Sequence, residues 1–249
     1  KTSFSITTKL IKLSTLAFAC TAGLSAQAHA SIKYEEQQKL HDIAAQVSAK
    51  RIGSDIQTLV DFGTRHTLSE TKSDTRGIGA ARRWIKKEFE KISAQCGGCL
   101  EVIEVKDTIS GEKRIPNPVE VVNIVAIQRG STKPNRMVIM SGDIDSRVSD
   151  VMDFTSDSPG ANDNASGVAG VIEAARVLSK HKFNGSVLYA ALSGEEQGLF
   201  GGKILTAYAQ EHNWQVHGVL NNDMIGNITG INGVTDNTTA RIFSEGTRV

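Results

Sequence analysis

Apolar residues recur at two different spacings along this chain, and the spacing changes from helical to extended between residues 94 and 100. From Arg76 to Ala94, apolar positions lie three or four residues apart, which predicts a helix with a charged outer face. Runs rich in β-branched residues follow and predict strands. The predicted strands are Leu100–Val105, Val119–Gln128, Arg136–Met140, Ser186–Leu192 and Gln215–Asn221.

Further helices are predicted between and before these strands. They cover residues 32–50, residues 54–62 with Ser54 as the N-cap, a stretch starting near Asn164, and Leu199–His212. The alternation of strands and helices predicts an α/β fold with a mostly parallel, mixed central sheet and helices on both faces. In such sheets ligands bind outside the carboxyl ends of the strands.

The first thirty residues have the layout of a secretory signal peptide. Three lysines among the first twelve residues are followed by an uncharged stretch from Leu13 to Ala28, which ends in an A-x-A pattern at residues 28–30. We therefore expect an exported protein, located in the periplasm or the external medium. The alternatives are a mobile N-terminal helix or a lipoprotein attached at Cys20.

Composition narrows the class of protein further. Hydrophobic residues make up 39% of the chain and charged residues 22%, which is typical of a globular protein. The formal net charge is +1 and no basic stripe stands out, so we expect no nucleic-acid partner. No apolar run reaches the ~18–20 residues that a membrane-spanning helix needs, so no membrane partner is expected after signal removal. The oligomeric state is left open.

Two cysteines remain once the signal peptide is removed. Cys96 and Cys99 stand in the sequence CGGC, and in an oxidising compartment such a pair most simply forms a short structural disulfide. A thioredoxin-type redox pair is the alternative. That motif has a strand before it and a helix starting at it, whereas here a predicted helix precedes and a predicted strand follows.

Acidic residues gather where this fold places its functional site. Six of them follow the predicted strands or stand at an adjoining loop–helix junction, and these are Asp143, Asp145, Asp163, Glu195, Glu196 and Asp223. Converging carboxylates repel one another, and a metal ion is the usual compensation. Any one of them alone would be interpreted as a surface acid, but the set predicts a metal site.

Four segments resemble metallopeptidase family 28, the family of bacterial leucyl aminopeptidases, aminopeptidase Y and glutamate carboxypeptidase. They are SGDIDSR (141–147), GANDNASG (160–167), SGEEQGL (193–199) and NNDMIG (221–226). The resemblance covers roughly residues 40 to 249 and implies an exported bacterial member with a zinc-aminopeptidase-like fold. We accordingly divide the chain into a signal peptide (1–30), an N-terminal helical lead-in (31–110) and a catalytic domain (111–249).

The resemblance implies a site with two zinc ions. Asp163 would bridge both metals, Asp223 would ligate one and Glu196 the other. Glu195 would be the general base that takes a proton from the attacking water, which a base must reach within hydrogen-bond distance. Two metals ~3.5–4 Å apart can hold both the nucleophile and the substrate carbonyl.

The chain departs from the family pattern at two places. Asp143 stands where the family usually has a histidine ligand, and Asp145 would orient that ligand from the second shell. A carboxylate can also ligate zinc, but it shifts the preference toward oxygen-loving metals, so Mn²⁺ is the alternative cofactor. The family's last histidine ligand has no counterpart after His217. We therefore expect a sequence truncated at its C-terminus.

The function that we expect is metal-dependent hydrolysis of peptide bonds, most simply by an aminopeptidase acting on peptide substrates. A carboxypeptidase or dipeptidase on the same scaffold is the first alternative. A glutaminyl cyclase with one zinc is a relative of another reaction class. The alternative that is not an enzyme is a catalytically impaired homologue that binds a partner. The intact pair Glu195-Glu196 argues against this alternative.

Overall fold

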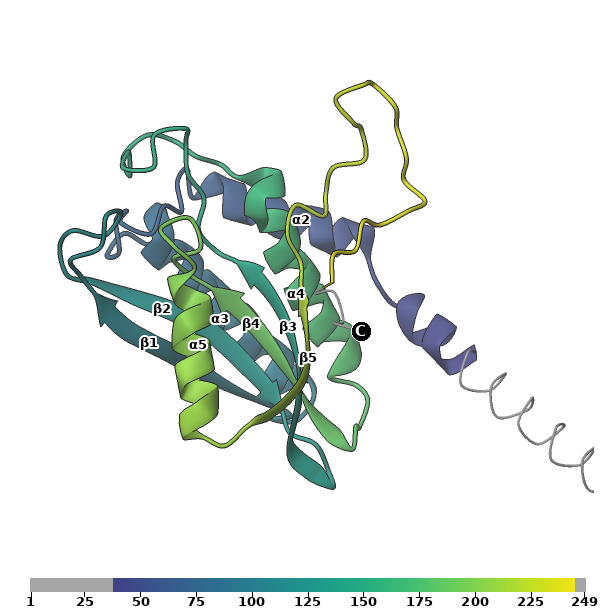
Figure 1. Ribbon diagram of the computed structural model, residues 1–249. Helices are drawn as coiled ribbons and strands as arrows, with labels where there is room; N and C mark the ends of the chain where they lie inside the picture. Colours follow the sequence, from purple (N-terminus) through teal and green to yellow (C-terminus); the bar gives the residue numbers. More distant parts are fainter. Residues whose placement is uncertain (1–37, 245–249) are drawn as a thin grey trace, which may run out of the picture. The chain divides into compact units, whose positions relative to one another are not determined.

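The computed structural model describes residues 38–244 (Figure 1). The predicted signal peptide at 1–30 and the start of the helix predicted at 32–50 therefore lie outside the described residues. The chain divides into two compact units, the second of which begins at Ser48. The described end of the first unit contains a helical stretch at residues 38–44. Our boundaries at residues 30 and 110 stay predictions.

The first helix of the second unit corrects two expectations. Helix α2 runs from Ala49 to Asp61 without interruption, and its N-cap is Ser48, whose hydroxyl accepts a hydrogen bond from the Arg51 amide at 3.3 Å. The predicted helix at 32–50 is thus broken at residues 45–48, and Ser54 lies inside α2 instead of capping it. The backbone amide of Ser48 also donates to Glu173 at 2.7 Å, so a contact distant in sequence fixes the start of this helix.

The five predicted strands form one mixed sheet in the order β1-β2-β4-β3-β5. Strands β3 and β4 are parallel, β3 and β5 are parallel, and β2 runs antiparallel to both β1 and β4. The predicted bounds of β2 and β5 are confirmed, whereas β1 and β3 extend further than the apolar pattern indicated. The observed strands are β1 (Leu100–Ile109), β2 (Val119–Gln128), β3 (Lys133–Asp143), β4 (Gly185–Leu192) and β5 (Gln215–Asn221).

Helices cover both faces of this sheet, as predicted (Figure 1). One buried cluster joins the sheet to α3 (Gly77–Gln95) and α4 (Ser166–Leu178) through residues such as Phe89 and Ile172, both fully buried. A second cluster joins the opposite face to α5 (Phe200–Glu211). Burial of side chains of this size stabilises a fold by roughly 1.5–3 kcal/mol each. Within residues 38–244, no helix is long and apolar enough to span a membrane.

A charged network fastens α4 to the neighbouring helices. Glu173 is almost completely buried and forms an ion pair with Arg51 of α2. Arg176, one turn further along α4, contacts Asp55 at 2.5 Å and Glu88 of α3 at 2.7 Å. Burial acts to raise the pKa of Glu173, but the hydrogen bonds from Arg51 and from the Ser48 amide, with the charges of Arg51 and Arg176, lower it overall. The three helices are thus held by packing and by buried charge pairs together.

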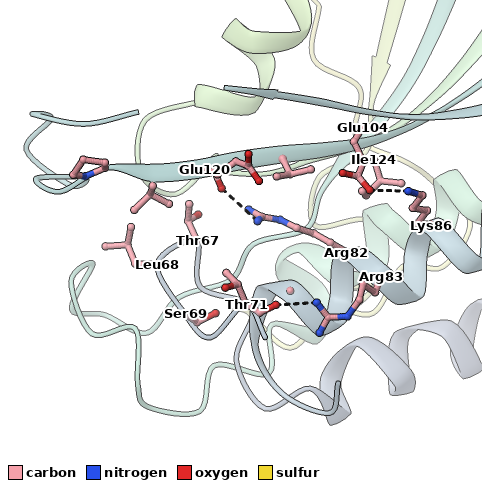
Figure 2. Close-up of a pocket in the computed structure, with 14 residues that line it drawn as sticks. Thr67, Leu68, Ser69, Thr71, Arg82, Arg83, Lys86, Glu104, Glu120 and Ile124 are labelled. Atoms are coloured by element: carbon pink, nitrogen blue, oxygen red, sulfur yellow. Dashed lines mark hydrogen bonds and ion pairs between the residues drawn. The ribbon is translucent and has the colours of Figure 1, made fainter. Parts of the chain in front are cut away.

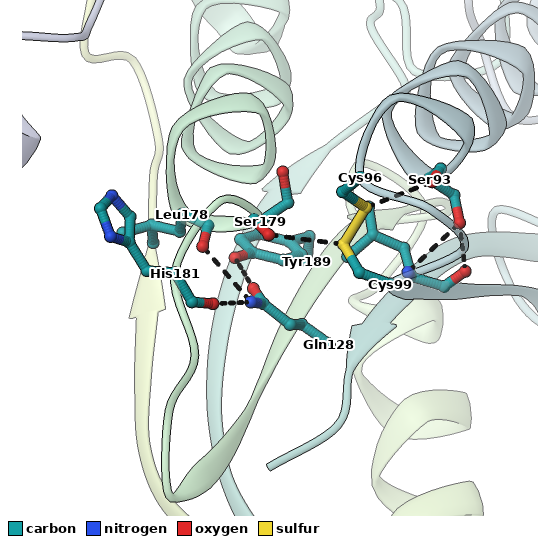
Figure 3. Close-up of a disulfide and its surroundings, with 9 residues drawn as sticks. Ser93, Cys96, Cys99, Gln128, Leu178, Ser179, His181 and Tyr189 are labelled. Carbon is teal, nitrogen blue, oxygen red and sulfur yellow. Dashed lines mark hydrogen bonds between the residues drawn. A yellow bond between two sulfur atoms is a disulfide. The ribbon is translucent and has the colours of Figure 1, made fainter. Parts of the chain in front are cut away.

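Cys96 and Cys99 form the predicted disulfide where α3 ends and β1 begins (Figure 3). Gly97 and Gly98 between them both adopt positive φ angles, which glycine accepts without steric cost. The Gly98 amide donates to the Ser93 carbonyl at 2.7 Å and closes the end of the helix. The Cys99 sulfur lies 3.5 Å from the carbonyl oxygen of Ser179, so the disulfide packs beside the end of α4.

Candidate metal centre

The parallel strands bring several predicted site residues to one edge of the sheet. Because β3, β4 and β5 point the same way, the segments that follow them meet at their carboxyl ends. Asp143 is the last residue of β3 and is buried, while Glu195, three residues after β4, is half-buried. Asp223, two residues after β5, is exposed. The end of one strand and the loops after two others thus form a shared acidic surface.

Asp145 lies directly beneath the turn that carries Glu195 and Glu196. Its carboxylate accepts hydrogen bonds from the backbone amides of Glu195 at 3.2 Å and Glu196 at 3.1 Å. The Thr67 hydroxyl donates to the same carboxylate at 2.9 Å. Asp145 is 1% exposed, so it has no room to meet substrate. The structure therefore gives Asp145 a positioning role toward the adjacent glutamates.

Asp163 precedes α4 in the segment Ala161–Ala165, which is kinked and not helical at Asp163 itself, and its side chain is exposed. Its neighbour Asn164 is buried and joins three parts of the site. The Asn164 side-chain amide donates to the carbonyl of Asn222 at 2.9 Å and to the Asp143 carboxylate at 3.4 Å. Its side-chain oxygen accepts from the amide of Met224 at 3.3 Å. Asn164 thus holds the segment that carries Asp223 beside Asp143.

The carboxylates lie near enough for their charges to act on one another. Burial and the charges of Asp145, Glu195 and Asp223 raise the pKa of Asp143 to about 7. Burial and neighbouring carboxylates, Asp145 first among them, raise the pKa of Glu195 to about 7. Burial raises the pKa of Asp223, with a contribution from Asp163. A cluster of carboxylates that raise one another's pKa values favours the binding of a cation, which relieves their mutual repulsion.

Glu196 differs from the others because it has a cationic partner. It forms an ion pair with Arg147, and that contact lowers its pKa while burial raises it more. The carbonyl oxygen of Glu196 accepts a hydrogen bond from Arg114 at 2.5 Å. Release of the Arg147 contact would free the Glu196 carboxylate to ligate a metal.

The donor set of carboxylates suits a divalent metal. Oxygen donors from carboxylates serve zinc and manganese ions alike. Among residues 38–244, no three His, Cys, Asp or Glu side chains converge closely enough to hold an ion as they stand. The chemistry of these residues fits a metal, although their placement does not yet form a site, and Asp143, Asp163, Glu196 and Asp223 stay the predicted ligands.

Arg65 is a residue of this site that the sequence did not reveal. Its guanidinium is buried and donates to four backbone carbonyls, two of which, Pro159 and Gly160, belong to the turn before Asp163. Burial lowers the pKa of Arg65 to about 10, against the charges of Asp145 and Asp163, so it stays cationic at neutral pH. The one signal in the sequence was an arginine flanked by Thr64 and His66 with no acidic neighbour.

His66 also braces the loop that follows Asp145. It is fully buried, and its Nδ1 accepts a hydrogen bond from the Leu68 amide at 3.1 Å. The other ring nitrogen, Nε2, must then carry the proton and donates to the Val151 carbonyl at 3.1 Å. Gln197 lies 3.1 Å from the same nitrogen. His66 thus connects this loop to the residue after Glu196.

Comparison with known protein families agrees with these features. The sequence model of peptidase family M28 matches residues 123–244 of this chain. A probable zinc metalloprotease of Leptosphaeria maculans is 43% identical over 210 residues, which cover 84% of this chain and 49% of that protein. A probable zinc metalloprotease of Pyrenophora teres f. teres is 46% identical over 209 residues, 84% of this chain and 43% of that protein. Both are fungal, which contradicts the expected bacterial member.

The chain spans about half the length of the curated relatives it matches. Among solved structures, the LapA aminopeptidase of Legionella pneumophila aligns with a TM-score of 0.60 at 22% identity, over 76% of this chain and 46% of that one. Porphyromonas gingivalis glutaminyl cyclase aligns with a TM-score of 0.59 at 20% identity, over 72% and 62% respectively. These likenesses confirm the zinc-aminopeptidase-like fold.

Proposed function

The chain belongs to peptidase family M28, and from this premise we propose that the protein is a zinc-dependent enzyme that hydrolyses peptide bonds. The two fungal relatives are named as probable zinc metalloproteases, which supports zinc as the metal. The observation that carries the proposal is the turn with Glu195 and Glu196, which Asp145 holds at the same sheet edge as Asp143. A module that only binds a partner has no need for such a pair.

In this proposal each carboxylate has a separate task. Asp143, Asp163, Glu196 and Asp223 would hold two zinc ions, with Mn²⁺ as the alternative metal. When bound, the metal supplies a lower pKa for the attacking water and a polarised substrate carbonyl. Glu195 stays unligated and takes the proton from that water.

The residues around the glutamate pair keep this geometry in place. Asp145 accepts hydrogen bonds from the backbone amides of Glu195 and Glu196 and so holds the backbone of the turn from which the Glu195 side chain extends. Thr67 in turn fixes Asp145. We further propose that the protein is exported, that its substrates are peptides, and that it removes residues from a free N-terminus. Cleavage at the carboxyl end is the alternative on this scaffold.

Glu195→Gln tests the assignment of the base. The amide keeps the shape of the side chain but cannot take a proton, so the rate constant kcat should fall by roughly 10²–10⁴-fold. Elemental analysis should show the same metal content as in the wild-type protein, because Glu195 is not a ligand. Glu211→Gln on the exposed end of α5 is the matched control and should leave kcat unchanged. Near-native hydrolysis by the Glu195 variant would exclude this mechanism.

A further inference from the structure

A cavity of about 460 Å³ lies between α3, the segment 67–71 and strands β1 and β2 (Figure 2). Hydroxyl groups and charged side chains line much of it, and Figure 2 shows Arg82 reaching from α3 toward Glu120. Pockets of roughly 300–1,000 Å³ are typical of small-molecule sites. The polar lining consists of Thr67, Ser69, Thr71, Arg82, Arg83, Lys86, Glu104 and Glu120.

Most charges on this lining are already paired. Lys86 contacts Glu104 at 2.8 Å across the cavity wall. Arg83 contacts Asp74 at 3.2 Å, and Glu120 contacts Lys106 at 2.9 Å. Pairs of this kind at a surface contribute little net charge to a neighbouring ligand site. The remaining charged group of the lining is Arg82.

Arg82 is 8% exposed, and within the described residues it forms no ion pair. Its Nε donates to the Ser193 hydroxyl and its Nη1 to the Glu120 carbonyl, each at the long distance of 3.4 Å. Its Nη2 is buried without any hydrogen-bond partner. Buried donors almost always have a partner, so the unpaired Nη2 leaves a donor unused on a guanidinium whose side chain lines the cavity.

We propose that this cavity binds the carboxylate group of a small ligand, an amino acid or the end of a short peptide, with Arg82 as the recognising cation. The guanidinium fork matches the two oxygens of a carboxylate and pairs with them more strongly than with neutral acceptors. Because Nη2 is covered in this structure, Arg82 must turn toward the cavity on binding. That turn gives up only two long hydrogen bonds.

The cavity adjoins the proposed catalytic edge through two of its contacts. Thr67 lines the cavity and donates to Asp145, which holds the turn of Glu195. Arg82 donates to Ser193, two residues before Glu195. The cavity lining is therefore linked by hydrogen bonds to the turn that carries the glutamate pair. The claim that the cavity binds a carboxylate is independent of the proposed function. The further claim that this carboxylate is part of the substrate rests on the proposed function.

Calorimetric titration with N-acetylleucine and with N-acetylleucinamide tests the proposal on the unaltered protein. The two probes differ only in the charge of the carboxyl end, so the acid should bind at least about tenfold more tightly than the amide. Both titrations are repeated with a chelator, because a carboxylate could also bind a metal ion. Equal affinities, or an affinity that the chelator abolishes, would overturn the proposal.

Two variants locate the site. Arg82→Gln should lose about tenfold or more in affinity for N-acetylleucine, whereas Arg83→Gln, which changes an exposed arginine of the same lining, should retain it. Unchanged binding in the Arg82 variant would contradict the proposal. If circular dichroism shows that the Arg82 variant does not fold, the relative affinity of the wild-type protein for N-acetylleucine and N-acetylleucinamide tests the proposal by itself.

Hydrolysis identifies the source of the carboxylate. A lower KM for leucylglycine than for leucylglycinamide, in the wild-type protein only, assigns the cavity to the end of the substrate. Equal KM values together with tight N-acetylleucine binding assign it to a free amino acid. Should neither peptide be hydrolysed, the proposed function fails while the binding result still stands.

Discussion

Arg65 offers the sharpest test of how the candidate metal centre is held together. The side chain is 1% exposed, and all of its hydrogen bonds go to backbone carbonyls. These carbonyls belong to Leu59 at 2.9 Å, Ile144 at 2.8 Å, Pro159 at 2.7 Å and Gly160 at 3.0 Å. One cation thus ties α2 to both ends of the loop between Asp145 and Asp163.

Arg65→Met removes the cation while keeping most of the volume. Four buried carbonyls then lose their donor, and at about 1.5 kcal/mol for each charge-assisted hydrogen bond the loss amounts to about 6 kcal/mol. Relief of the cost of burying a charge offsets part of this, so we expect a loss of roughly 3–6 kcal/mol. Domains are stable by only about 5–15 kcal/mol, so the variant should be marginal or unfolded.

Arg83→Met is the matched control for this prediction. Arg83 also donates to three backbone carbonyls, those of Thr71, Lys72 and Ser73, but its side chain is 45% exposed. Water can replace it there, so the loss should stay within about 1 kcal/mol. Urea unfolding followed by circular dichroism measures both free energies. Similar losses in the two variants would show that burial is not the reason for the large contribution of Arg65 to the free energy of unfolding.

Three further predictions concern the metal, the charge network and the disulfide. Asp143→His should retain metal and shift its preference from Mn²⁺ toward Zn²⁺, as competition titration would show; a loss of metal binding would exclude Asp143 as a ligand. Glu173, paired with Arg51, has a lowered pKa, so it stabilises the fold above pH 4.5 and this contribution disappears as the pH falls through the lowered value. Glu173→Gln should therefore lower the free energy of unfolding at neutral pH and flatten its decline in acid, and an unchanged decline would contradict this. Replacing Cys96 and Cys99 by serine should cost about 2 kcal/mol of stability, the figure for a very short loop, without changing hydrolysis; a loss of activity in folded protein would favour the redox alternative.

The sequence predicted the strands and α3 well because their signals are local. Apolar residues recur every two residues in a strand and every 3.6 in a helix whenever one face of the element is buried, so the pattern can be recognised without knowledge of the neighbouring elements. The start of α2 was mispredicted for the opposite reason. Ser54 and Ser48 are both good caps by type, but only Ser48 is held by Glu173, which lies 125 residues away in the sequence. No pattern around either serine carries that information.

The candidate site divides in the same way. The convergence of Asp143, Glu195 and Asp223 could be predicted because each lies at or just after a strand end, and the topology alone brings these strand ends together. The roles of Arg65 and Asn164 could not be predicted, because most of their partners are backbone atoms of distant segments. Arg65 bonds to carbonyls up to 95 residues away, and Asn164 to the carbonyl of Asn222, 58 residues away. Backbone acceptors have no signature in a sequence.

The most direct test of the account is the dependence of peptide hydrolysis on metal. Release of chromophore from aminoacyl-nitroanilides is followed in purified protein, before and after treatment with a chelator and after metal is added back. We expect release that the chelator abolishes and that Zn²⁺ or Mn²⁺ restores. Hydrolysis that continues unchanged in metal-free protein would contradict the central claim. So would folded, metal-loaded protein that cleaves neither aminoacyl-nitroanilides nor peptides at their carboxyl end.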